Sequence, residues 1–227
     1  MASTSQIVND LMDEIGKDSP DIAHALELTV GEVVVELLGQ NEGRFSSLSK
    51  TETLSILTTQ TRYILPADFN TAKVTSTEVD TDGTLKGIIY IMPKAEIQER
   101  LVRGGAAHAR FCYVEFSEDG YNGDGRGYYL TLAKEVTENT TYEFEYYRKP
   151  VTTDVDLIRN PGSIKRGVRA NSPKYFPENN DVNMAIYENV KKGFSDKPQR
   201  YATSILVTPS PQTSRRNVRM HRIGRGG

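Results

Sequence analysis

The sequence predicts an α+β fold, in which N-terminal and C-terminal helices frame an inserted antiparallel β-sheet and an extended C-terminal arm follows. Three changes of pattern along the 227 residues lead to this expectation. Apolar residues recur at the helical period in the first forty residues, alternate with polar ones from about Thr51 to Pro150, and lose helical periodicity after Ser204. We therefore expect N-terminal helices over residues 1–50, a β domain over 51–150, a helical part over 151–200 and an extended basic arm over 201–227.

Two helices are expected at the N-terminus. The first has a serine or threonine at positions 3–5 as its N-cap and Gly16 as its stop. The second begins at Ser19 and Pro20, because serine caps helices and proline suits the first helical position, and it ends at Gly39. Its apolar stripe is broad enough to need a packing partner. The stripe comprises Ile22, Leu26, Val30, Val33, Val34, Leu37 and Leu38.

The central hundred residues predict a meander of antiparallel strands. Asp82-Gly83 is a hairpin signal between two of the strands, and Pro93 opens a short helix that closes at Gly104-Gly105. The expected strands are 54–57, 63–65, 74–79, 85–91, 111–116, 128–132 and 142–147.

A proline marks a corner of this predicted sheet. Proline cannot donate to a sheet ladder and holds the preceding residue extended, so Leu65-Pro66 should end a strand at a sheet edge. Tyr63 and Phe69 flank the proline as aromatic anchors. We expect Tyr63, Leu65, Pro66 and Phe69 to form a structural corner.

Only one helix is predicted after Pro150, because six prolines punctuate this part of the chain. The run from Asn160 to Pro177 is expected to be broken, and Ser204–Val207 is expected to form at most a single strand. The predicted helix places five apolar residues on one face, namely Val182, Ala185, Ile186, Val190 and Phe194.

Motifs that suggest chemistry each have a simpler interpretation. The glycine-rich run 120–127 precedes a strand, whereas a phosphate-binding loop opens a helix, so a hairpin turn is expected. Asp80 and Asp82 are expected to form a turn rather than bind a metal ion. Glu143 and Glu145 should lie on the solvated face of an alternating strand.

Histidine and cysteine offer no local motif either. His24, His108 and His221 lie far apart in the sequence, and Cys112 stands alone in an apolar run, which predicts a buried, inert thiol. A single cysteine excludes an internal disulfide and a multi-cysteine zinc site. We expect no catalytic residues, no bound metal and no cofactor.

Charge is distributed unevenly along the chain. The last thirteen residues contain Arg215, Arg216, Arg219, Arg222 and Arg225 and no acidic residue. The rest of the chain holds 23 basic and 30 acidic residues, a difference of −7. A basic end on an acidic body predicts docking on a negative surface, either nucleic acid or an acidic protein wall, and the alternative is a disordered solubilising end. No signal peptide and no membrane span are predicted.

The order of these features resembles the head-to-tail adaptor proteins of tailed bacteriophages, also called connector or head-completion proteins. The resemblance covers residues 5–195 and depends on short motifs. The most specific is Tyr63-Ile64-Leu65-Pro66-Ala67-Asp68-Phe69; Tyr129-Leu130-Thr131-Leu132 and the aromatic strand from Tyr142 to Pro150 support it.

The resemblance implies a structural virion protein and not an enzyme. In this family a homo-oligomeric ring, usually dodecameric, binds the portal protein above and a tail, nozzle or neck protein below. Genomic DNA passes through the central channel without sequence-specific binding. The protein would be found in the virion neck, and in the host cytoplasm during assembly.

The resemblance also gives the five C-terminal arginines a role in docking to the portal. The alternative hypothesis is a nucleic-acid-binding module that grips phosphates with the same arginines.

Overall fold

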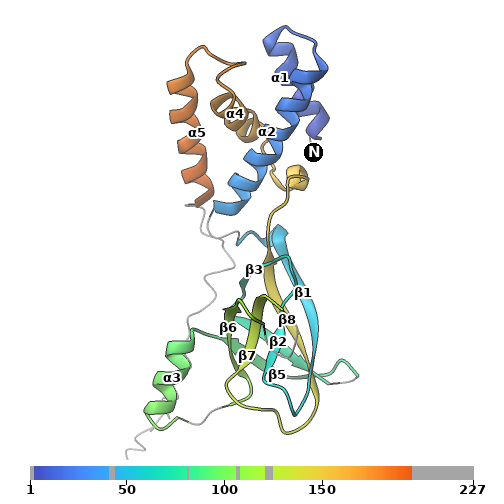
Figure 1. Cartoon of the computed structure of the whole chain (residues 1–227), viewed down its shortest axis with the longest axis vertical. Helices are drawn as coiled ribbons and strands as arrows, with labels where there is room; N and C mark the ends of the chain where they lie inside the picture. Colours follow the sequence, from blue (N-terminus) through green and yellow to red (C-terminus); the bar gives the residue numbers. More distant parts are fainter. Residues whose placement is uncertain (1–2, 41–43, 81, 106–107, 121–124, 196–227) are drawn as a thin grey trace, which may run out of the picture. The chain divides into compact units, whose positions relative to one another are not determined.

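The computed structural model describes residues 3–40, 44–80, 82–105, 108–120 and 125–195. These residues fall within the unit Met1–Lys197, and Figure 1 labels their helices and strands. The helices are α1 (Thr4–Ile15), α2 (Pro20–Gly39), α3 (Lys94–Val102), α4 (Pro161–Asn171) and α5 (Asn180–Ser195). Short 3₁₀ turns are η2 (Ser46–Leu48) and η3 (Asp154–Leu157). The strands are β1 (Ser49–Ile56), β2 (Arg62–Ile64), β3 (Phe69–Ala72), β4 (Thr75–Val79), β5 (Leu85–Ile91), β6 (Phe111–Ser117), β7 (Gly127–Leu132) and β8 (Thr140–Arg148).

The two N-terminal helices are confirmed. The hydroxyl of Ser3 accepts a hydrogen bond from the amide of Gln6, and Gly16 ends α1 in the left-handed conformation at φ 65°. Ser19 occupies the N-cap position of α2, but its side chain makes no capping hydrogen bond there. The predicted stripe of α2 faces the helical core, with every member except the half-buried Ile22 fully buried.

The expectation that the run after Asn160 is broken was wrong, because α4 forms there. Pro161 lies in the first turn, where a missing amide proton costs nothing, and the side chain of Asn160 accepts a hydrogen bond from the amide of Gly162. Gly167 lets this helix approach its neighbours closely: a Cβ at this position would lie 2.5 Å from Val33 and 2.7 Å from the ring of Tyr187. The proline therefore starts a helix instead of preventing one.

Helix α5 forms as expected, but its predicted apolar face was only partly correct. Val190 and Phe194 pack against the helical core, whereas Val182 is 54% exposed and Ile186 is 38% exposed. The residue that α5 buries most completely is Tyr187. Its hydroxyl donates to the carboxylate of Glu36 on α2, and its side chain is buried in the helical core.

All eight strands belong to one nearly closed sheet, with the order β1-β8-β4-β5-β6-β7-β2 and with β3 also paired to β8. The expected antiparallel meander was wrong in three respects. β5 and β6 are parallel, strands distant in the sequence such as β1 and β8 are neighbours, and β3 was not predicted. Helix α3 is the crossover between β5 and β6, and a parallel pair needs such a connection. The sheet is therefore mixed, inserted between α2 and α4 in the chain.

The predicted turns within the sheet are confirmed. Gly83 has φ 83°, and the Asp82 carboxylate accepts a hydrogen bond from the amide of Thr84 in the turn between β4 and β5. The glycine-rich run joins the antiparallel strands β6 and β7, with Gly120 and Gly125 at positive φ. The described element that follows the run is strand β7, whereas a phosphate-binding loop is followed by a helix.

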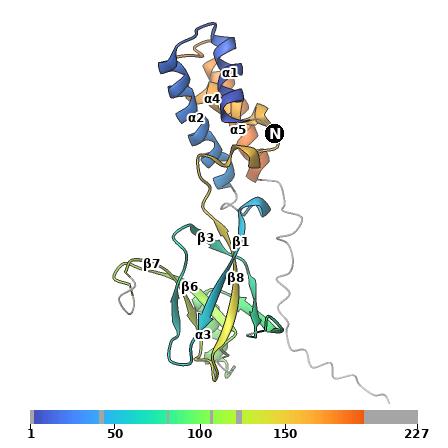
Figure 2. The same ribbon diagram turned by 90° about the vertical axis from the view of Figure 1, so that its right-hand side faces the viewer.

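Two separate hydrophobic cores result. One is formed by α1, α2, α4 and α5, which group together in Figure 2, with Leu48 of η2 and Val155 of η3; the other is formed mainly by the strands. Val33, Leu37 and Val168 are fully buried in the first core, and Leu130 and Phe144 are fully buried in the second. The predicted strand at Ser204–Val207 lies outside the described residues.

Candidate functional site

The corner from Tyr63 to Phe69 connects the two ends of the sheet. Strand β2 stops at Ile64, and the amide of Leu65 still donates to the carbonyl of Tyr128 at 2.8 Å. The amide of Phe69 then donates to the carbonyl of Pro66 at 2.9 Å, which closes a tight turn. The chain enters β3, which pairs with β8 at the other side of the sheet.

The aromatic residues of the corner are both buried, but they make different contacts. The Tyr63 hydroxyl accepts a hydrogen bond from the amide of Leu57 and donates to the carbonyl of Gln60 at 2.7 Å, so it holds the loop between β1 and β2. The Phe69 ring packs in the sheet core, with ring centroids 5.2–6.1 Å away at Tyr128, Tyr146 and Phe144. Leu65 is also buried in this core, and Pro66 is half-buried.

Asp68 is the residue of this corner to which the sequence assigned no role. Its carboxylate accepts a hydrogen bond from the Tyr146 hydroxyl of β8 at 2.8 Å and from the Lys50 ammonium of β1 at 2.6 Å. Partial burial alone would raise the pKa of Asp68, but the hydrogen bonds from Lys50 and Tyr146 outweigh it and lower that pKa. The presence of an acid in a Leu-Pro-x-Asp-Phe turn is the only sequence signal of this role.

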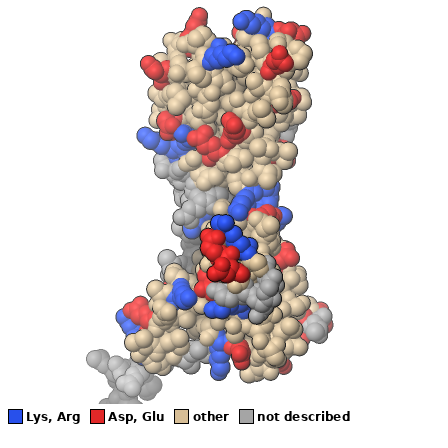
Figure 3. Space-filling view, viewed as in Figure 1, with Lys and Arg blue, Asp and Glu red and all other residues tan. Residues whose placement is uncertain are grey.

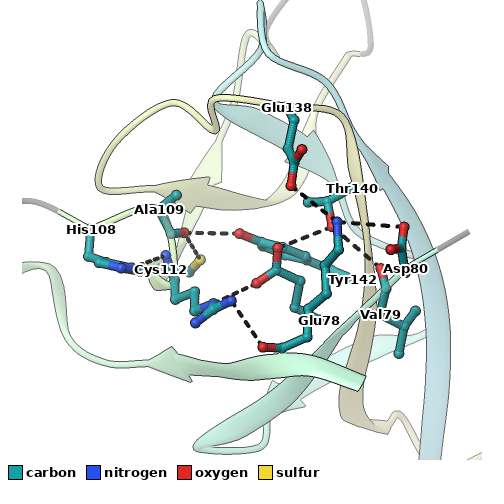
Figure 4. Close-up of polar contacts among 11 residues, drawn as sticks. Glu78, Val79, Asp80, His108, Ala109, Cys112, Glu138, Thr140 and Tyr142 are labelled. Carbon is teal, nitrogen blue, oxygen red and sulfur yellow. Dashed lines mark hydrogen bonds and ion pairs between the residues drawn. The ribbon is translucent and has the colours of Figure 1, made fainter. Parts of the chain in front are cut away.

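A second polar cluster, shown in Figure 4, borders a cavity of about 290 Å³ at the sheet. The Glu78 carboxylate is buried and accepts hydrogen bonds from Arg110 Nε at 2.5 Å and from the Thr140 hydroxyl at 3.1 Å. The guanidinium of Arg110 lies directly against Gly87, where an added Cβ would approach its Cζ to 2.5 Å. Tyr142 donates its hydroxyl proton to the carbonyl of Ala109.

These contacts assign a structural role to the Glu78 cluster. The buried carboxylate is already bound by a cation and a hydroxyl, so its charge is compensated within the protein. His108 borders the cavity, and its Nδ1 accepts a hydrogen bond from the backbone amide of Arg110 at 3.1 Å. Long-range pairs of this kind have no local sequence signal, and the sequence did not predict them.

The other residues with chemical potential are dispersed. Cys112 is buried, and burial raises the pKa of its thiol well above the usual value, as an inert thiol requires. His24 is exposed on α2, and His221 lies outside the described residues. Glu143 and Glu145 share the polar face of β8, where they contact Thr77 and Lys73, respectively. Among the described residues, no group of three histidine, cysteine or acidic side chains is placed to hold a metal ion.

The arginines predicted to dock on a partner, Arg215, Arg216, Arg219, Arg222 and Arg225, lie outside the described residues. Residues 1–195 contain 21 basic and 29 acidic residues, a difference of −8. On the face seen in Figure 3, side chains of both signs are interspersed. None of the described helices combines the length and the apolar character needed to cross a membrane.

Comparisons with known proteins give no family for this chain. No family model matches the sequence, and no curated protein matches it significantly.

Proposed function

We propose that the protein is a structural head-to-tail adaptor of a tailed bacteriophage. It assembles as a ring, dodecameric by analogy with the family that the sequence resembles, and links the portal protein to a tail, nozzle or neck protein. Genomic DNA passes through the ring. The observation that carries the proposal is the Leu-Pro-x-Asp-Phe corner in a sheet inserted between two pairs of helices that share one core.

The packing of the chain supports a binding role rather than catalysis. The buried carboxylates of Glu78 and Asp154 and the buried hydroxyl of Tyr187 are engaged in ion pairs and hydrogen bonds within the chain. Exposed apolar side chains remain on α5 and on α2, where Leu28 is 58% exposed. Such side chains are available to contacts between copies, and contacts between different surfaces of identical copies close into rings.

In this proposal the basic C-terminal arm docks on the portal. Its five arginines, with no acidic residue among the last thirteen positions, suit a partner surface of negative charge. Several arms that bind one portal ring together gain avidity from multivalency even where each contact is weak.

Electron microscopy and native mass spectrometry of the full chain, alone and mixed with the portal protein of the same phage, test the proposal. We expect a ring with a central channel on the portal, and we expect the protein in purified virions. A chain that forms no ring and does not bind the portal would overturn it.

Two variants of the arm distinguish portal docking from the alternative, direct binding of nucleic acid. One variant ends at Ser214, and its matched control replaces the five arginines by lysine, which keeps the charge but loses bidentate geometry. If the arm grips DNA, affinity falls steeply with salt, with a log–log slope of up to about −4.5 for five contacts, and the truncation abolishes it. If the arm docks on the portal, the truncation abolishes portal binding and leaves DNA affinity unchanged.

A further inference from the structure

The two hydrophobic cores of this chain have no residue in common among the described residues. The chain passes between them at two places in this part: between α2 and β1, and between β8 and η3. We call the second passage, residues 148–154, the connector, a segment of this chain and not the connector protein of a phage. Two cores joined only by short connecting segments would unfold independently unless those segments are themselves held in place by contacts to both cores.

A bidentate ion pair closes the connector on itself. Arg148, the last residue of β8, donates from Nη1 to Asp154 Oδ2 at 2.8 Å and from Nη2 to Asp154 Oδ1 at 2.6 Å. Asp154 Oδ2 also accepts a hydrogen bond from the amide of Val151, and Arg148 Nη1 donates to the carbonyl of Lys149. Both side chains are mostly buried, with 19% of Arg148 and 10% of Asp154 exposed, so water competes little for the pair.

Each end of the connector is attached to a different core. On the sheet side, the amide of Lys149 donates to the carbonyl of Asp68 at 2.7 Å, in the same corner that Tyr146 and Lys50 hold. On the helical side, Val155 directly after Asp154 is buried in the helical core. Thr152 lies against α2, where a Cβ added to Gly31 would approach the Thr152 Cβ to 2.8 Å.

We propose that the connector, closed by the Arg148–Asp154 pair, couples the two cores into one cooperative folding unit. A partner that binds the helical part therefore also stabilises the sheet, and the reverse holds, because the two cores open together. The coupling is a property of the single chain and does not depend on ring formation.

Urea unfolding followed by hydrogen exchange and mass spectrometry reads the two cores separately. Peptides from α2 and α5 report on the helical core, and peptides from β6 and β8 report on the sheet core. We expect both sets to lose protection at one urea midpoint in the native chain. Asp154→Asn breaks the charge pair inside the connector, and we expect it to separate the two midpoints by about 0.5–1 M urea.

The matched control is Glu14→Gln. Glu14 also forms a bidentate pair, with Arg169, but both partners lie within the helical part, on α1 and α4. This variant should lower the common midpoint without separating the two sets of peptides. Gly31→Ala, which pushes α2 away from Thr152, is a second test of the connector with the same readout and replaces neither residue of the ion pair.

Two outcomes would overturn the proposal. One is a native chain whose two peptide sets already unfold at different midpoints. The other is coincident midpoints in both Asp154→Asn and Gly31→Ala, which would show that the cores are coupled elsewhere. Measurements at two protein concentrations separate these effects from assembly, because only an oligomer has a midpoint that depends on concentration.

Discussion

Asp68 accepts a 2.8 Å hydrogen bond from the hydroxyl of Tyr146, although the two residues are 78 positions apart in the sequence. The bond joins the turn after β2 to the last strand of the sheet, and Lys50 on β1 binds the other carboxylate oxygen. A single carboxylate therefore fixes three segments at the point where the sheet comes close to closing. This relationship accounts for the acid in the Leu-Pro-x-Asp-Phe turn.

Removing the charge of Asp68 should loosen this corner. We expect Asp68→Asn to lower the free energy of unfolding by about 1–2 kcal/mol, because it loses a charge-assisted bond that is only partly shielded from water. Urea denaturation measures the change. Asp82→Asn is the control, since this carboxylate lies in an exposed turn, and it should leave the midpoint unchanged. Equal effects of the two variants would contradict the role of Asp68.

Stability should fall in acid because several carboxylates have lowered pKa values. Burial opposes the shift at Asp68, Glu115 and Asp154, but hydrogen bonds and cations outweigh it. The unfolded chain then binds protons more readily, so this stability is complete above about pH 5 and is lost as the pH falls through the lower folded pKa values. Urea midpoints between pH 7 and pH 2.5 test this. Asp154→Asn should show a shallower decline, and an unchanged pH profile would contradict the assignment.

Gly167 should tolerate no side chain, because α4 lies against Val33 and Tyr187 at this position. We expect Gly167→Ala to lower the free energy of unfolding by about 1–3 kcal/mol through overpacking. Gly193→Ala on α5 meets nothing within 4 Å and should stabilise the protein by up to about 1 kcal/mol from helix propensity. Thermal unfolding followed at 222 nm compares the two. Stabilisation by both variants would show that α4 packs less closely.

Gly87→Ala should act on the sheet through Arg110. The new methyl group displaces the guanidinium from Glu78 and leaves a buried carboxylate without its cation, at a cost of about 1–3 kcal/mol. A double-mutant cycle with Arg110→Met isolates this effect. In the methionine background, Gly87→Ala should cost much less. If Gly87→Ala destabilises the Arg110→Met protein as much as the native protein, the added methyl group does not act through Arg110.

Local signals predicted the elements whose ends are fixed by their own neighbours. Ser3 and Gly16 mark α1, Asp82-Gly83 marks the β4–β5 turn, and Pro66 marks the end of β2. Each signal acts within about four residues, so the sequence contains the complete interaction. Pro161 was misread because the same residue either breaks a helix or begins one, and the choice depends on the Asn160 cap and on packing of α4 against α2 and α5.

By itself, the sequence determined most of the helical and strand segments of the described part, though not α4 or β3, together with the corner from Tyr63 to Phe69 and the absence of a local catalytic motif. The tertiary structure alone decided the parallel pairing of β5 with β6, the burial of Tyr187 in place of Val182, and the pairs Asp68–Tyr146, Glu78–Arg110 and Arg148–Asp154. The physical reason is the separation along the sequence over which each interaction acts. Propensity and capping act between neighbours along the chain, whereas hydrogen bonds between distant strands and the choice of a buried helix face depend on which segments meet in space.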